Sequence, residues 1–225
     1  MSKRNKNRIN YYYFSYNNIR MSEEATAPND VPDATYSIIT IGDSAVGKTC
    51  LAQRFIGMEF KESYMTTIGI DSMTKKVKKD NKNYIFQIWD TTGQERFATL
   101  AKQYLRKAHG VLFVFAYNDR KSYESIHKWL EMLKSANSKI QMCFALLGNK
   151  SDLSKEEKKV TEEEGEKLGQ ELGMSFFDVS AKTGVNIDNS FNYLIDKIIE
   201  TNKDTTEEAN AKLRREKRKK KEGCC

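Results

Sequence analysis

The chain has 225 residues, of which 39% are hydrophobic and 11% aromatic, and this suits one packed α/β domain with tails. Its formal net charge is +7, but residues 212–221 alone hold eight Lys or Arg and one Glu, an excess equal to the whole net charge. The remainder is neutral, which argues against a basic nucleic-acid-binding face on the domain. The four cysteines show no zinc or disulfide spacing and no apolar run could cross a bilayer, so we expect a cytosolic chain.

Composition divides the chain into three parts. Residues 1–33 are rich in Asn, Lys, Tyr and Ser, and we predict a disordered N-terminal extension that lacks the features of a signal peptide. Residues 34–201 alternate between apolar and polar segments and form the predicted globular domain. Residues 202–225 are predicted to be a flexible basic tail that ends in Cys224 and Cys225.

The first half of the domain is predicted to contain a strand, a helix and a hairpin. The β-branched segment Tyr36–Ile41 favours a strand, and Leu51, Phe55 and Ile56 then fall at helical spacing. Two further strands are predicted on either side of a polar turn at residues 78–82, namely Gly69–Lys79 and Asn83–Asp90.

The second half alternates apolar strands with amphipathic helices. A helical stretch is expected to end near Ala108, and Thr161 and Glu164 have the spacing of a capping box at the start of another helix. Continuous apolar runs predict three strands buried on both faces, namely Val111–Ala116, Cys143–Gly148 and Met174–Val179. This alternation predicts a parallel sheet covered by helices on both faces, with ligands bound at the carboxyl ends of the strands.

One motif stands between the first strand and the first helix. Residues 42–49 read G-D-S-A-V-G-K-T, which matches the phosphate-binding pattern G-x-x-x-x-G-K-[ST]. A glycine turn that leads into a helix N-terminus places backbone N–H groups and a partial positive charge around phosphates. Lys48 can reach the β- and γ-phosphates, and the Thr49 hydroxyl can ligate Mg²⁺.

Three more polar segments follow predicted strands. Asp90 opens the sequence D-T-T-G-Q, where a carboxylate can hold Mg²⁺ through water and Gly93 leaves a backbone N–H free for a γ-phosphate. In N-K-S-D, the carboxylate of Asp152 can accept from the ring N–H and the amine of guanine, an amine that adenine lacks. In S-A-K, which begins at Ser180, backbone N–H groups can meet the guanine carbonyl oxygen. Each segment alone reads equally well as a polar loop.

Together, the order and spacing of G-D-S-A-V-G-K-T, T-T-I-G, W-D-T-T-G-Q-E, N-K-S-D and S-A-K closely resemble the Ras-like small GTPases. The segments I-G-I-D and W-D-T-T-G-Q-E-R-F, with the terminal Cys-Cys, resemble the Rab family in particular. This resemblance implies the α/β fold of a P-loop GTPase. That fold has three layers, with a six-stranded, mostly parallel sheet that includes one antiparallel strand, and about five helices.

The resemblance also implies a set of site residues. The catalytic residues would be Gln94, Lys48 and Thr67, and the Mg²⁺ site would comprise Thr49, Thr67 and Asp90. Lipid would be attached to Cys224 and Cys225. The nucleotide GTP or GDP would be bound by Asp43, Ser44, Ala45, Val46, Gly47, Lys48, Thr49, Cys50, Phe60, Tyr64, Thr67, Gly93, Asn149, Lys150, Asp152, Ser180, Ala181 and Lys182.

The function implied is a monomeric switch that binds and hydrolyses GTP and regulates vesicle traffic. It would cycle between the cytoplasm and the cytoplasmic face of membranes through a prenylated tail that also meets an anionic membrane surface. Its expected partners are an exchange factor, a GTPase-activating protein, effectors and an escort chaperone of the GDI type. We expect no nucleic acid.

Two residues depart from the Rab pattern. Thr92 stands where Rabs usually have Ala, and Ser72 stands where an aromatic effector-binding residue is usual. They leave open an alternative, a nucleotide-bound scaffold that recruits effectors with little or no hydrolysis. A third hypothesis is nucleic-acid binding through the basic tail. A P-loop kinase is disfavoured, because the N-K-S-D segment would then have no function.

Overall fold

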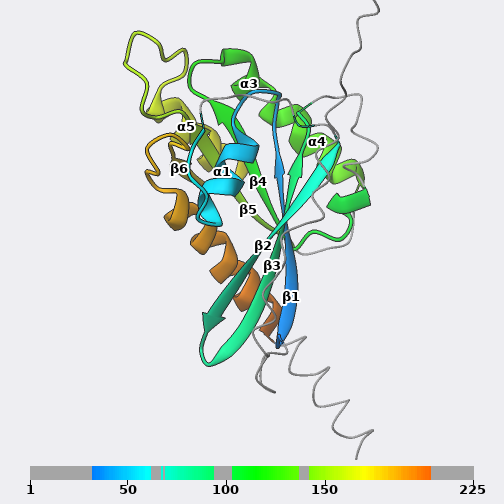
Figure 1. The fold of residues 1–225 in the computed structure, drawn as a ribbon. Coiled ribbons are helices and arrows are strands. Elements are labelled where there is room, and N and C mark those ends of the chain that lie inside the picture. Colours follow the sequence, from blue (N-terminus) through cyan, green and yellow to red (C-terminus); the bar gives the residue numbers. More distant parts are fainter. Residues whose placement is uncertain (1–31, 62–66, 68, 94–102, 137–141, 204–225) are drawn as a thin grey trace, which may run out of the picture. The chain divides into compact units, whose positions relative to one another are not determined.

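A computed structural model describes residues 32–61, 67, 69–93, 103–136 and 142–203, which belong to one compact unit beginning at Pro32 (Figure 1). Its six strands form a single sheet in the order β2-β3-β1-β4-β5-β6. The strands are β1 (Ala34–Ile41), β2 (Ile70–Lys79), β3 (Lys82–Thr91), β4 (Gly110–Ala116), β5 (Cys143–Asn149) and β6 (Ser175–Asp178). The helices are α1 (Lys48–Phe55), α3 (Arg120–Glu124), α4 (Ile126–Ala136), α5 (Glu162–Leu172) and a last helix of residues 187–203.

The sheet has the topology expected of a P-loop GTPase. Only β2 and β3 pair in antiparallel fashion, and all other neighbouring strands are parallel. The predicted fold class is confirmed. Most of the predicted extension and tail lies outside the described residues, and residues 202 and 203 continue the last helix. The proposed division of the chain into three parts stays a prediction.

Helices cover both faces of the sheet because the buried strands are apolar on both sides. On one face, Leu51 of α1 and Phe191 of the last helix pack with Ile38 and Phe86. On the other face, residues of α4 and α5 join a second cluster that includes Phe113. All seven residues of β4 are buried, as the continuous apolar run predicts. The two clusters pack on opposite faces of the sheet, and together they hold the carboxyl ends of β1, β4 and β5 in place.

Local details differ from the sequence-based expectations in the hairpin, at the end of α1 and near Ala108, where the helix before β4 already ends at Leu105. The hairpin turn is only two residues long, because Asp80 and Asn81 both adopt positive φ values of 51° and 57°. Such a turn matches the twist of the strands, so pairing extends to Lys79 and Lys82. Helix α1 ends at Phe55, and Ile56 is its C-cap. The predicted capping box is confirmed, with Thr161 and Glu164 bonding reciprocally at the start of α5.

The side chain of His109 accepts a hydrogen bond from the backbone of Ser37 in β1, in the place of a strand partner. The Nδ1 atom of its side chain accepts a hydrogen bond from the Ser37 backbone N–H at 3.0 Å. The backbone N–H of His109 donates to the Ser37 carbonyl at 2.8 Å. The imidazole also packs edge-on against Tyr36, with 5.0 Å between ring centroids. Burial lowers the pKa of His109 below its ordinary value of 6.5. The folded protein therefore favours the neutral imidazole.

We expect this histidine to make the free energy of unfolding depend on pH. Below pH 6.5 the unfolded chain binds a proton at His109 more readily than the folded chain. The contribution of the neutral imidazole to the free energy of unfolding is therefore lost as the pH falls through the pKa of the folded state. Urea unfolding between pH 7 and pH 5 should show a shallower pH dependence for His109→Asn than for the wild type. His127→Gln changes the exposed second histidine and should retain the wild-type slope. Equal slopes for His109→Asn and the wild type would contradict the prediction.

The carboxyl ends of β1, β3 and β5 lead directly into the polar segments singled out in the sequence. The chain passes from β1 to β2 and β3 on one side of β1, and it resumes at β4 on the other. Such a reversal of strand order marks the ligand crevice of open α/β sheets. Among the described residues, no helix has both the length and the apolar character needed to span a membrane.

Candidate nucleotide-binding site

The loop from Gly42 to Thr49 follows a tight path that its glycines make possible. Gly42 has φ of 148°, and a Cβ there would lie 2.1 Å from the Val114 carbonyl oxygen of β4. Gly47 has φ of 97° at the N-cap of α1, and a Cβ there would lie 2.3 Å from Nδ2 of Asn149. Larger side chains would push the loop away from both neighbours. The helix N-terminus and the loop N–H groups thereby stay available to an anion.

Lys48 is buried inside this loop. Its Nζ donates to the carbonyl oxygens of Gly42 at 2.9 Å and Asp43 at 2.7 Å. Burial lowers the pKa of Lys48 to about 8, against the attraction of Asp90 and Asp43, which raises it. A buried ammonium in this position is well placed for a multiply charged anion, which would favour its protonated form.

Thr49, Thr67 and Asp90 gather beside the loop. The two hydroxyl oxygens are 2.9 Å apart, and Thr49 donates to Oδ2 of Asp90 at 2.6 Å. Thr67 reaches the same Oδ2 at 3.5 Å. Burial raises the pKa of Asp90, with the hydrogen bond from Thr49 opposing the shift. Its Oδ1 is buried and has no hydrogen-bond partner within the described part of the chain. The cluster therefore presents hard oxygen atoms that protein bonds do not fully satisfy.

A polar hollow runs between this cluster and the phosphate loop. Gly93 closes one side of it, because a Cβ there would lie 2.2 Å from the Asp43 carbonyl carbon and the Ser44 nitrogen. Its backbone thus contacts the loop directly. The hollow is lined by Ser44, Ala45, Gly47, Lys48, Thr49, Thr67, Thr91, Thr92 and Gly93.

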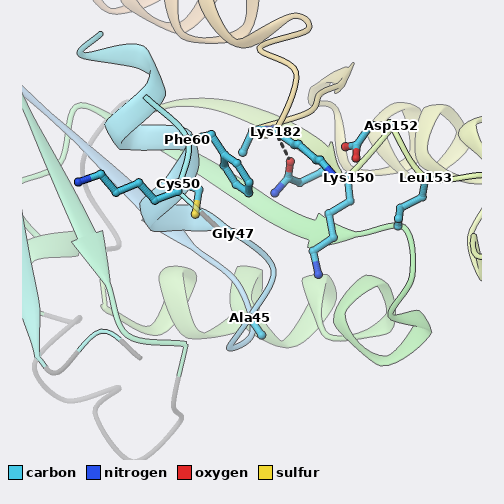
Figure 2. A pocket seen from close by; sticks show the side chains of 11 residues that line it. Ala45, Gly47, Cys50, Phe60, Lys150, Asp152, Leu153 and Lys182 are labelled. Carbon is cyan, nitrogen blue, oxygen red and sulfur yellow. Dashed lines mark hydrogen bonds between the residues drawn. The ribbon is translucent and has the colours of Figure 1, made fainter. Parts of the chain in front are cut away.

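A second, more apolar pocket of about 250 Å³ adjoins the hollow (Figure 2). In the view of Figure 2, Phe60 and Cys50 lie on one side of it, and Lys150 and Leu153 lie on the other. Ala45 and Gly47 belong to both pockets, so the two form one continuous site. The lining comprises Ala45, Gly47, Cys50, Phe60, Lys61, Asn149, Lys150, Asp152, Leu153, Ala181 and Lys182.

Asn149 joins the three loops that surround this pocket. Its side chain is buried, with Nδ2 donating to the Val46 carbonyl at 2.7 Å and Oδ1 accepting from the Ala181 N–H at 3.1 Å. These bonds span 103 and 32 residues of sequence. Asn149 therefore fixes the phosphate loop and the S-A-K segment relative to its own strand end.

Asp152 is exposed at the pocket, and its carboxylate is oriented by a neighbour. Oδ1 accepts from the Ser180 hydroxyl at 2.5 Å, and that hydroxyl in turn accepts from the Thr183 N–H at 3.1 Å. Lys150 adopts φ of 69°, and its Nζ donates to Asn118 at 3.2 Å. A carboxylate held by a second residue can present acceptors in a fixed direction to a donor edge of a ligand.

Most of the expected site residues are brought together. Val46 and Ser180 support the site from buried positions, Val46 through its carbonyl bond to Asn149. Lys61 and Leu153 also line the base-side pocket, although no motif singled them out. The sequence could have indicated Leu153, because it is an apolar residue directly after Asp152. Nothing in the sequence indicated that Lys61 would line the pocket. Four expected residues lie outside the described residues, namely Tyr64, Gln94, Cys224 and Cys225.

Comparisons with known proteins agree with this arrangement. A model described as the Ras family matches residues 37–200. The chain is 41% identical over 167 residues to Ras-related protein Rab-13 of Mesocricetus auratus, covering 74% of this chain and 81% of that protein. It is 39% identical over 172 residues to human Ras-related protein Rab-15, covering 76% and 80%. It is 40% identical over 160 residues to RABD1 of Arabidopsis thaliana, covering 71% and 77%.

Proposed function

Since the chain belongs to the Rab family of Ras-like small GTPases, which bind and hydrolyse GTP and act in vesicle traffic, we propose that the two adjoining pockets are the nucleotide site of a membrane-associated switch. The observation that supports this assignment most strongly is the double hydrogen bond of Asn149, which assembles three loops around one pocket. The family does not favour a scaffold that binds nucleotide without turnover.

The phosphates would occupy the hollow beside α1. Backbone N–H groups from Asp43 to Lys48 would surround them, and the Lys48 ammonium would exchange its two carbonyl partners for β- and γ-phosphate oxygens. Gly93 would offer its N–H to the γ-phosphate from the opposite side.

The oxygen cluster fits Mg²⁺. This ion prefers hard oxygen ligands and commonly combines one or two carboxylates with substrate phosphates and water. The described residues contain no group of three or more acidic, His or Cys side chains that could hold a metal alone, so phosphate oxygens would complete the set. Thr49 and Thr67 would be direct ligands, and Asp90, with its unpartnered Oδ1, would act through water. When bound, Mg²⁺ would neutralise charge on the β- and γ-phosphates.

Guanine would occupy the base-side pocket. Asp152 would accept from its ring N–H and amine, the S-A-K segment would lie beside its carbonyl oxygen, and the stem of Lys150 would lie along one face. Phe60 would flank the base on the side shown in Figure 2. Asn149 would act through the loops rather than by direct contact.

Hydrolysis would proceed by in-line attack of water on the γ-phosphorus. Gln94 would orient the water, and Lys48 with the loop N–H groups would stabilise the charge that develops on the phosphate oxygens. No arginine supplies a finger from within the described site, so the unaided rate should be roughly 10⁻⁴ to 10⁻³ per second, by analogy with Ras. A GTPase-activating protein would raise it by on the order of 10⁵.

The switch itself would be the segment that carries Thr67 and the segment that begins at Gly93. Both would be ordered by the γ-phosphate and released after hydrolysis. Effectors would read the ordered form, an exchange factor would release GDP, and an escort chaperone of the GDI type would hold the lipidated protein in the cytoplasm.

The tail would anchor the protein to membranes. Residues 212–221 would meet anionic lipid at about 1 kcal/mol per basic residue near the surface. Geranylgeranyl chains on Cys224 and Cys225 would provide two lipid anchors, and two are needed because one alone binds only marginally.

In cells, the double change Cys224→Ser and Cys225→Ser should move the protein from the membrane fraction to the cytosol. Each single change should give an intermediate distribution, because one lipid chain remains. Fractionation followed by immunoblotting measures both effects. A double variant that stays on membranes would contradict lipid anchoring. Salt-sensitive nucleic-acid binding that disappears on removing residues 212–221 would instead support the nucleic-acid alternative.

A further inference from the structure

Trp129 connects a distant helix to the phosphate loop. It lies on α4 and is 6% exposed, within the core cluster on that face of the sheet. Its Nε1 donates a hydrogen bond of 2.7 Å to Oδ1 of Asp43, a residue 86 positions earlier in the chain. Because its ring is buried in the core, the indole N–H has a fixed direction, and the contact is set by the packing of α4 rather than by a flexible side chain.

Asp43, the residue that Trp129 contacts, also contacts two other segments of the site. The Asp43 carbonyl accepts from Lys48, which belongs to α1. The peptide between Asp43 and Ser44 lies very close to Gly93. A Cβ added to Gly93 would lie 2.2 Å from the Asp43 carbonyl carbon and the Ser44 nitrogen. Thus α1, the segment that follows β3, and α4 all meet at Asp43, and the bond from Trp129 to its carboxylate is the contribution of α4.

We propose that Trp129 is a positioning residue for nucleotide binding: its indole N–H holds the Asp43 carboxylate and so sets the first turn of the phosphate loop. This inference rests on the nucleotide site proposed above. A carboxylate on an anion-binding loop would repel phosphates if it could turn toward them. A charge-assisted hydrogen bond from a buried donor keeps it at α4, while its charge still attracts Lys48.

The experiment measures the rate at which fluorescently labelled GDP leaves the full-length, Mg²⁺-loaded protein when unlabelled GDP is added in excess. Trp129→Phe keeps most of the buried ring and removes the donor, and it should speed GDP dissociation by about tenfold. Leu133→Ala is the matched control, since Leu133 is buried on the same helix in the same cluster. It should lower the melting temperature yet leave the dissociation rate within about twofold.

Two backgrounds separate positioning from simple packing. In an Asp43→Ala protein the acceptor is gone, so adding Trp129→Phe should have no further effect on GDP dissociation. In an Asp43→Asn protein an amide oxygen can still accept, so adding Trp129→Phe should again accelerate dissociation. A wild-type rate for Trp129→Phe, or the same acceleration in the Asp43→Ala background, would overturn the inference while leaving the nucleotide site intact. Failure of the wild type to bind GDP would overturn both.

Discussion

Changing Asp152 to Asn should lower the affinity for GDP by about 10²- to 10⁴-fold and shift preference toward a xanthine nucleotide. Two hydrogen bonds to a charged acceptor are at stake, each about 1.5–3 kcal/mol. The asparagine amide offers one acceptor and one donor, which fits the ring N–H and C2 carbonyl of xanthine but not the two donors of guanine. The bond that orients Asp152 comes from the Ser180 hydroxyl, which can serve either amide atom.

Equilibrium titration of GDP and XDP against the wild type and the variant measures this switch. Asp188→Asn makes the same chemical change at an exposed position on the last helix and should retain wild-type selectivity. The melting temperature of Asp152→Asn should stay close to that of the wild type, because residue 152 is exposed. A variant that keeps GDP affinity within about threefold of the wild type would show that Asp152 does not contact the base.

Changing Asn149 to Ala should damage both stability and nucleotide binding. The Val46 carbonyl and the Ala181 N–H would lose their side-chain partner in a buried site, at about 1–3 kcal/mol each. The free energy of unfolding should therefore fall by about 2–6 kcal/mol. GDP affinity should also fall by at least about tenfold, because the loops on either side of the pocket are no longer held together.

Urea unfolding of the nucleotide-free proteins and GDP titration measure the two effects separately. Asn189→Ala is a suitable control, since the Asn189 side chain is exposed and donates to the side chain of its neighbour Asn186. It should alter neither quantity appreciably. If Asn149→Ala unfolds at the wild-type urea concentration, its double hydrogen bond does not hold the site together.

The strands, the layers and the grouping of motifs could be predicted because each depends on local patterns. Apolar runs mark buried strands, and a parallel sheet brings the residues that follow its strands to one edge. The gathering of Lys48, Asp90 and Asn149 follows from that rule alone. The capping box at Thr161 was likewise visible, because both of its partners lie within four residues.

Contacts that a side chain makes with a residue distant in the sequence could not be predicted in the same way. The bonds of Asn149 to Val46 and of Trp129 to Asp43 join segments that no periodicity relates. The two-residue turn at Asp80 depends on which register the strands adopt, and the sequence allows more than one. The half-buried position of His109 also depends on its neighbour in space, Tyr36, rather than on its neighbours in sequence.

The most direct test of the account is single-turnover hydrolysis of GTP preloaded in the presence of Mg²⁺, compared between the wild type and Gln94→Leu. The wild type should convert GTP to GDP at roughly 10⁻⁴ to 10⁻³ per second. Gln94→Leu should be slower by about tenfold or more, because leucine cannot orient the attacking water. Equal rates in the two proteins would contradict a hydrolytic switch built on this site and would favour a nucleotide-bound scaffold.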